Sequence, residues 1–319
     1  MRAIILFLFA LMSSALYAQE AAQDLFKTGT SLIKRGSYLI AATTLETADR
    51  LNPGDVGVAC NLSAAYAYSG DIDRSIEQLK AAVDKEPIPA RGILFYNLGT
   101  LQKKKGLLSE AEYSYNNSIY FLPYFAPSYL QLGKLYLRTG ENEKAKDYFS
   151  IGNSMDNFIP DLGEKEIKEG MTGYMIILEG QDSEPELFLY HSPAWHLAIA
   201  INYKNNHKPS DAKEEIKQAI AALDKNSLLA SDRAAFLETH ITLGNIYLEE
   251  QNYDSALEEF RLAYGINSRH LGVITSLGYT FFLKGDPEGA LRYCREAEAI
   301  NKDYQPIQKL KKIIEDKKR

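Results

Sequence analysis

The chain has 319 residues, of which 45% are hydrophobic and 24% charged, a composition typical of a folded protein that excludes extensive disorder. Its 36 Lys and Arg residues against 42 Asp and Glu residues give a formal net charge of −6. Neutralisation of phosphates dominates nucleic-acid affinity, so an acidic chain with no broad basic stretch excludes nucleic acid as an expected partner.

Residues 1–18 have the features of a secretory signal peptide. Arg2 precedes the apolar run AIILFLFALMSSALYA, which ends in small residues. Cleavage after Ala18 would leave Gln19 first, and cleavage after Ala15 is the alternative. An uncleaved anchor is the other interpretation, but a run of about 16 residues is shorter than the ~20 that span a bilayer. The sequence therefore predicts export, with a periplasmic or cell-envelope-associated location in a bacterium.

One spacing pattern returns four times over residues 22–159. A small residue is followed by a large apolar residue three places on (Gln102 in the third unit), by Ala or Ser after twelve places, and by another large apolar residue four beyond that. The four small residues are Gly29, Ser63, Gly99 and Gly133. Such a fixed period indicates a solenoid, whose units stack because none buries its apolar face alone.

Each unit is predicted to form a helical hairpin. Large apolar residues occur at helical spacing on both sides of a Gly, which suits two antiparallel helices joined by a short turn. A small residue such as Gly133 lets two helix backbones approach, and Ala145 of the second helix fits the narrow gap. A bulkier side chain at either place is expected to overpack the contact.

Residues 160–192 interrupt the pattern. The string EKEIKEGMTGYMIILEGQ can be aligned with a first helix, followed by EPELFLYH as a truncated second helix. A β-hairpin built from GYMIIL and LFLY is the alternative, since both are short apolar runs. We favour the degenerate repeat, and in either case we expect an insertion that bends the solenoid near a functional face.

Three further units follow over residues 193–304, with Ala200, Gly244 and Gly278 as their small residues. Residues 305–319 are predicted to form a capping helix and a basic tail. Ile307, Leu310 and Ile313 or Ile314 would close the apolar face of the last unit.

Two strings carry a family resemblance: YNLGTLQKKKGLLSEAEYSYNNSIYFLP and LGNIYLEEQNYDSALEEFRLAYGIN resemble the tetratricopeptide repeat (TPR) family. The resemblance covers about residues 22–304 apart from 160–192. It implies an all-α fold, a right-handed superhelical solenoid of antiparallel helix pairs. It also implies a concave face that usually holds a partner polypeptide.

Catalytic motifs are missing from the sequence. It contains no phosphate loop, dinucleotide glycine fingerprint, nucleophile elbow or two-histidine zinc helix. His196 and His240 occupy equivalent unit positions and are expected to be partly buried structural residues. We therefore predict no catalytic residues, no metal and no cofactor. An enzyme would require the 160–192 stretch to fold over His191 and His196 as a closed polar pocket.

The two cysteines lie in distant units, too far apart for a disulfide. Cys294 is expected to be a buried hydrophobe. Cys60 falls on the stripe that should face the concave groove, which leaves a reactive thiol as an alternative to a packed one.

The groove is predicted from the stripe of each first helix that does not pack on its neighbour. It is aromatic and basic in the first four units and more apolar in the last three. The candidate partner-binding residues are Asn61, Tyr68, Tyr96, Asn97, Lys104, Lys134, Arg138, Tyr279 and Phe282. Asn61 and Asn97 recur at one unit position and are expected either to hydrogen-bond a partner's backbone or to serve local packing.

These features predict a non-catalytic protein–protein interaction scaffold or adaptor of the bacterial cell envelope. Its partner would be a protein or peptide, and membership of a membrane-associated complex is compatible with export. A carrier of a small apolar ligand or lipid in the second half is the alternative. The sequence leaves the oligomeric state open.

Overall fold

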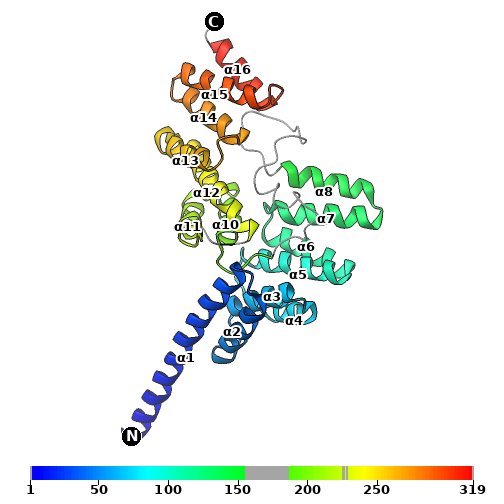
Figure 1. The fold of residues 1–319 in the computed structure, drawn as a ribbon, viewed down its shortest axis with the longest axis vertical. Helices are drawn as coiled ribbons and strands as arrows, with labels where there is room; N and C mark the ends of the chain where they lie inside the picture. The colour runs from blue at the N-terminus through cyan, green and yellow to red at the C-terminus, as the bar shows by residue number, and fades with distance from the viewer. Residues whose placement is uncertain (1, 155–186, 225–226, 228, 318–319) are drawn as a thin grey trace.

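The computed structural model describes residues 2–154, 187–224, 227 and 229–317. Within those residues the chain forms fifteen α-helices, one 3-10 turn and no strand. Consecutive helices pack as antiparallel pairs (Figure 1), so the predicted all-α solenoid of helix pairs is confirmed.

The helices form a first and a second stack. The first stack comprises α1 Arg2–Lys34, α2 Tyr38–Leu51, α3 Val56–Ser69, α4 Ile72–Ala82, α5 Arg91–Lys105, α6 Leu108–Phe121, α7 Ala126–Thr139 and α8 Asn142–Ser154, with the 3-10 turn Val83–Lys85 after α4. The second stack comprises α10 Pro193–Asn205, α11 Pro209–Ala221, α12 Ala230–Glu249, α13 Tyr253–Ile266, α14 Leu271–Leu283, α15 Pro287–Ile300 and α16 Gln305–Lys317.

Glycine makes the tight turn inside several hairpins. Gly70 ends α3 in the left-handed conformation with φ 96°. Its N–H donates to the Ala67 carbonyl, and the Asp71 N–H donates to the Tyr66 carbonyl at 2.8 Å. This pattern satisfies the last carbonyls of the helix, and a left-handed residue without Cβ carries no steric penalty.

Small residues let the two helices of a hairpin approach. A Cβ added at Gly133 would lie 2.8 Å from the Phe149 ring, and one added at Gly244 would lie 2.5 Å from the Phe260 ring. Ala145 of the facing helix is fully buried. The predicted close contact between the helices is therefore present.

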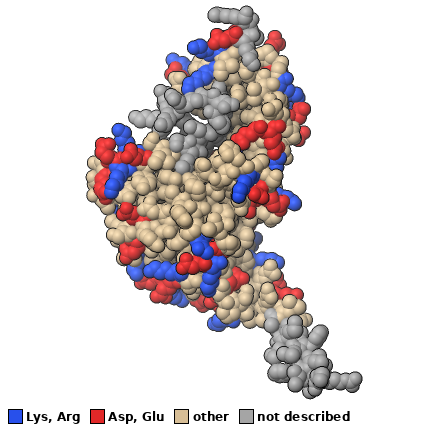
Figure 2. Space-filling model, turned by 180° about the vertical axis from the view of Figure 1, so that it is seen from behind, with Lys and Arg blue, Asp and Glu red and all other residues tan. Residues whose placement is uncertain are grey.

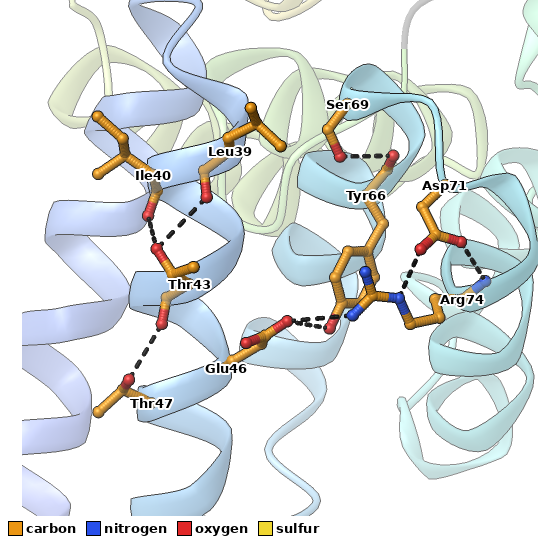
Figure 3. A network of polar contacts seen from close by, with 9 residues as sticks. All are labelled: Leu39, Ile40, Thr43, Glu46, Thr47, Tyr66, Ser69, Asp71 and Arg74. Carbon is orange, nitrogen blue, oxygen red and sulfur yellow. Dashed lines mark hydrogen bonds and ion pairs between the residues drawn. The ribbon is translucent and has the colours of Figure 1, made fainter.

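A polar network on the outside joins α2, α3 and α4 (Figure 3). The Tyr66 hydroxyl donates to Glu46 Oε1 at 2.8 Å, and Arg74 Nη1 lies 3.3 Å from the same oxygen. Arg74 Nε also donates to Asp71 Oδ2 at 2.6 Å. Burial is the main cause that raises the pKa of Tyr66 to about 12, so its hydroxyl stays a donor at neutral pH. The network links α2 of the first hairpin to α3 and α4 of the next.

The start of the second stack shares the core of the first. Trp195, Leu197 and Ile199 of α10 belong to the same buried cluster as residues of α2 to α8. Figure 1 shows α10 near the middle of the molecule, with the second stack running from there to α16 at one end. Residues 155–186, which carry most of the interrupted stretch, lie outside the described residues.

Helix α16 closes the second stack. Ile307, Leu310 and Ile314 are fully buried and share a core with Ile274 and Cys294. The capping helix is therefore present as predicted, with Ile314 rather than the more exposed Ile313 turned into the core.

No helix of the described residues combines the length and apolar character that a membrane span needs. The secretory signal over residues 1–18 stays a prediction.

Candidate polypeptide-binding face

Four residues of the chain itself, Leu187–Tyr190, lie across the first stack. They form neither helix nor strand, yet Leu187, Phe188 and Leu189 are only 3%, 3% and 1% exposed. They contact what we call the inner face, which consists of Asn61 and Tyr68 of α3 and Tyr96 and Asn97 of α5. The helix expected over EPELFLYH is not formed by its described residues, because their backbone groups bond to side chains of the first stack instead.

The Asn97 carboxamide pairs with both backbone groups of Phe188. Its Nδ2 donates to the Phe188 carbonyl at 2.8 Å, and its Oδ1 accepts from the Phe188 N–H at 2.9 Å. Asn97 is 1% exposed, so water does not compete for these bonds. One side chain thus satisfies a donor and an acceptor that could not otherwise be buried.

Asn61 and Tyr68 hold the residues on either side. Asn61 Oδ1 accepts from the Tyr190 N–H at 2.8 Å, and the Tyr68 hydroxyl accepts from the Leu187 N–H at 3.0 Å. Asn61 Nδ2 donates to Thr30 Oγ1 of α1 at 2.8 Å, which fixes the orientation of the carboxamide. The backbone N–H groups of residues 188 and 190 both donate to an Asn side chain, and this two-residue spacing matches the period of an extended chain.

The Phe188 ring occupies an aromatic pocket. Its centroid lies 5.4 Å from that of Tyr96 and 5.3 Å from that of Phe125, with interplanar angles of 85° and 69°. Tyr96 and Phe125 also meet edge to face at 5.2 Å. Edge-to-face packing is the preferred geometry of aromatic pairs, so the three rings stabilise one another beyond the area they bury.

The Tyr190 side chain lies at the other end of the segment. Its hydroxyl is 3.3 Å from Glu86 Oε2, and a Cβ added at Gly57 of α3 would come within 2.7 Å of its ring. Glu86 is 5% exposed, and burial is the main cause that raises the pKa of its carboxyl above the usual range. Gly57 therefore provides room for the ring, and the ring covers a buried acid.

A histidine pair follows the segment. His191 adopts a left-handed backbone with φ 53°. Its Nδ1 lies 3.0 Å from His196 Nε2, and His196 Nδ1 lies 2.7 Å from Glu215 Oε2. Burial, and then the neighbouring His196, lower the pKa of His191. Both hydrogen bonds form when each imidazole carries its proton on Nδ1, because His191 then donates to His196 and His196 donates to Glu215.

His196 and His240 are structural residues, as predicted. His196 is 7% exposed and bonds Glu215, and the half-buried His240 bonds Glu259 in the equivalent place at 2.7 Å. Among the described residues, no three His, Cys, Asp or Glu side chains are grouped as metal ligands.

Cys60 lies beneath the segment. Its thiol donates to the Phe188 carbonyl at 3.6 Å, and burial is the main cause that raises its pKa to about 12. A nucleophilic cysteine needs a thiolate, so Cys60 is a packing residue. Cys294 is 1% exposed, as expected for a buried hydrophobe, and both cysteines are free.

The structure brings together only four of the nine residues predicted for partner contact. Asn61, Tyr68, Tyr96 and Asn97 form the inner face, although Tyr96 is fully buried and touches the chain's own Phe188. The other five lie elsewhere: Lys104 and Arg138 are exposed near the ends of α5 and α7, Lys134 is half-buried on α7, and Tyr279 and Phe282 pack against the core around α16.

Two contributors were not selected from the sequence: Glu86 and the segment Leu187–Tyr190. The apolar run LFLY in an interrupted repeat was the available signal for the segment. Nothing in the local pattern of Glu86 marks it as buried.

Charged residues of both signs are mixed along the edges of the face shown in Figure 2, with a broad area of other residues between them. Neither sign forms a continuous patch there.

Tetratricopeptide repeat models match residues 60–124, 126–150 and 237–270. Together with the paired helices, these matches show that the chain contains tetratricopeptide repeats in both stacks.

Two relatives have low sequence identity to this chain. The chain is 23% identical over 292 residues to the BBSome complex member BBS4 of Bos taurus, which covers 90% of this chain and 53% of that protein. It is 22% identical over 232 residues to the protein O-mannosyl-transferase TMTC1 of Homo sapiens, which covers 70% of this chain and 26% of that protein. The chain therefore spans about half the length of one relative and about a quarter of the other.

Solved structures include a tetratricopeptide repeat protein from Parabacteroides merdae, 14% identical with a TM-score of 0.39, covering 93% of this chain and 99% of that one. Another is pilF of Pseudomonas aeruginosa, 12% identical with a TM-score of 0.39 and the same two coverages of 93% and 99%.

Proposed function

We propose that this protein is a non-catalytic interaction scaffold of the bacterial cell envelope, and that it holds a partner polypeptide on the inner face of its first stack. The repeats supply the scaffold. The observation that carries the proposal is the Asn97 carboxamide, which bonds both the N–H and the carbonyl of Phe188. A surface that satisfies a peptide backbone in this way is suited to polypeptide.

Backbone recognition explains why side-chain amides are buried there. Burying a carboxamide without a partner costs about 1–3 kcal/mol, so an occupant that covers Asn97 must offer it hydrogen bonds. Tyr96 and Phe125 add an aromatic pocket that selects a ring at one place of the occupant. The backbone bonds provide affinity and the pocket provides specificity.

The non-catalytic assignment rests on the state of the candidate groups. The Cys60 thiol is held protonated by burial, His191 Nδ1 is engaged with His196, and the other His196 nitrogen is engaged with Glu215. The transferase named among the relatives is a protein of which this chain spans about a quarter, so we do not extend that activity here.

The envelope location rests on residues 1–18 alone. Membership of a protein assembly is consistent with the name of the BBSome relative, at 23% identity. The apolar-ligand carrier gains no support, because Tyr279 and Phe282 pack against the core around α16.

Photocrosslinking in cells tests the proposal. A benzoyl-phenylalanine would replace Tyr68 of the inner face or the half-buried Phe26 of α1, with the exposed Glu77 of α4 as the matched control. The Phe26 carbonyl accepts from Thr30, whose hydroxyl contacts Asn61. We expect discrete adducts from the first two sites that are missing from the Glu77 site. Equal capture at all three sites, or no capture at Tyr68 and Phe26, would contradict it. Recovery of the adducts in the envelope fraction tests the location.

A further inference from the structure

The segment on the inner face belongs to the chain itself, and its two ends differ in how well they fit. At the Phe188 end, both backbone groups and the ring have partners. At the Tyr190 end, the structure combines a buried acid, a left-handed non-glycine residue and two imidazoles in contact. The unfavourable contributions to binding of the segment are therefore concentrated at Tyr190 and at His191, the residue that follows it.

Glu86 is one of these costs. The Tyr190 hydroxyl lies 3.3 Å from its carboxylate, and the Arg91 guanidinium donates through Nε to the Glu86 backbone carbonyl at 2.8 Å. Burial is the largest influence on Glu86 and raises the pKa of its carboxyl. The Tyr190 hydrogen bond and the charge of Arg91 favour ionisation of this carboxyl, and the charge of Asp55 disfavours it. The Tyr190 hydroxyl supplies a hydrogen bond but no positive charge to this buried acid.

His191 adds strain to the same end. A left-handed backbone is uncommon for a residue with a Cβ and persists only where the surroundings hold it. Here it places the Tyr190 ring against Gly57 and brings His191 to His196. A segment from another molecule would fit the Asn97 and Phe188 positions without needing this turn.

Attachment in the same chain compensates these costs. A tethered segment has an effective concentration of about millimolar or more, so it remains bound even where its fit is imperfect. A free partner must therefore bind more tightly per contact in order to take its place.

Resting on the function proposed above, we propose that Leu187–Tyr190 is an internal ligand that a partner replaces. The partner segment is extended, has an apolar–aromatic–apolar sequence, and carries Lys or Arg where Tyr190 stands. The aromatic residue enters the pocket of Tyr96 and Phe125. The basic residue pairs with Glu86.

Fluorescence anisotropy with labelled peptides tests this. Peptides containing Leu-Phe-Leu-Lys, Leu-Phe-Leu-Tyr or Leu-Phe-Leu-Glu would be titrated with the full chain and with its Phe188→Ala variant. Truncation of a buried Phe weakens the internal segment by about a hundredfold or more. We expect the lysine peptide to bind the variant at least about tenfold more tightly than it binds the unaltered chain.

Three variants make the test specific. Phe188→Leu keeps an apolar side chain and should give a smaller shift in the same direction, which covers the case in which Phe188→Ala fails to fold. Phe260→Ala removes an equally buried ring from the second stack and should leave peptide affinity unchanged. Glu86→Gln, made together with Phe188→Leu, should abolish the preference for the lysine peptide over the glutamate peptide.

Equal affinity of the unaltered chain and both Phe188 variants for the peptides would overturn the internal ligand. Equal binding of the lysine and glutamate peptides would overturn the basic residue. If no peptide binds either Phe188 variant while the Tyr68 and Phe26 sites crosslink a partner, this inference fails and the proposed function stands. If peptides bind as expected but no partner is captured in cells, the proposed function fails instead.

Discussion

Asn61 and Asn97 occupy the same position in their repeat units and perform the same task. Both are almost fully buried, and both use the side-chain oxygen to accept a backbone N–H of the segment. The sequence left two roles open at these positions, a hydrogen bond to a partner's backbone or local packing. It did not predict that the backbone would come from the same chain, since Asn97 and Phe188 are 91 residues apart.

Replacing Asn97 by Ala should lower the free energy of unfolding by about 2–4 kcal/mol, because it leaves the buried N–H and carbonyl of Phe188 unpaired. Urea denaturation measures the change. Asn117→Ala is the control: the Asn117 amide donates to the Tyr113 carbonyl of its own helix, and its removal should cost less than about 0.5 kcal/mol. Equal losses for the two variants would contradict the role of Asn97.

His270 should make stability depend on pH. Its Nδ1 accepts the Val273 N–H at the start of α14, and burial lowers its pKa from 6.5 to about 4. Between these values the unfolded chain binds the proton and the folded chain does not. The contribution of neutral His270 to the free energy of unfolding is therefore fully present above about pH 6.5 and decreases as the pH falls towards 4.

The matched variant His270→Asn keeps a capping side chain and removes the titration. Thermal or urea unfolding should show that, between pH 6.5 and pH 4, the wild-type protein loses roughly 1–3 kcal/mol more free energy of unfolding than the variant does. Parallel stability curves for the two proteins would contradict the assignment.

Among the helices, hairpin packing was predictable because it depends on residues close in sequence. Gly133 faces Phe149 and Gly244 faces Phe260, and each pair lies within a single repeat. The described part of the interrupted stretch was not predictable in this way. The sequence favoured a helix there over a strand, and contacts with α3 and α5 hold the described residues in neither conformation.

Two glycines on neighbouring helices should respond to alanine in opposite directions. At Gly244 of α12 a Cβ would meet the Phe260 ring at 2.5 Å, so Gly244→Ala should destabilise the protein by about 1–3 kcal/mol. At Gly265 of α13 a Cβ meets nothing within 4 Å, so Gly265→Ala should stabilise it by about 0.5–1 kcal/mol through helix propensity. Thermal unfolding monitored by circular dichroism measures both, and a loss of stability at Gly265 would be inconsistent with this account.

For the whole molecule, the main consequence is that the start of the second stack shares the core of the first. The first stack does not present an empty inner face, because Leu187–Tyr190 covers it and α10 continues directly into the same buried cluster. The sequence correctly predicted repeats on both sides of an interruption. It could not predict where the second stack begins in space, because repeat spacing describes only contacts between neighbouring units.

Residue-resolved amide hydrogen exchange on the full chain tests the central claim, that Leu187–Tyr190 is bound to the first stack. Phe188 and Tyr190 lie outside any helix, yet their N–H groups donate to the buried Asn97 and Asn61. We expect both amides to exchange at least about a hundredfold more slowly than in an unstructured peptide, and to lose this protection in Asn97→Ala. Exchange of both amides at unstructured rates in the unaltered protein would contradict the account.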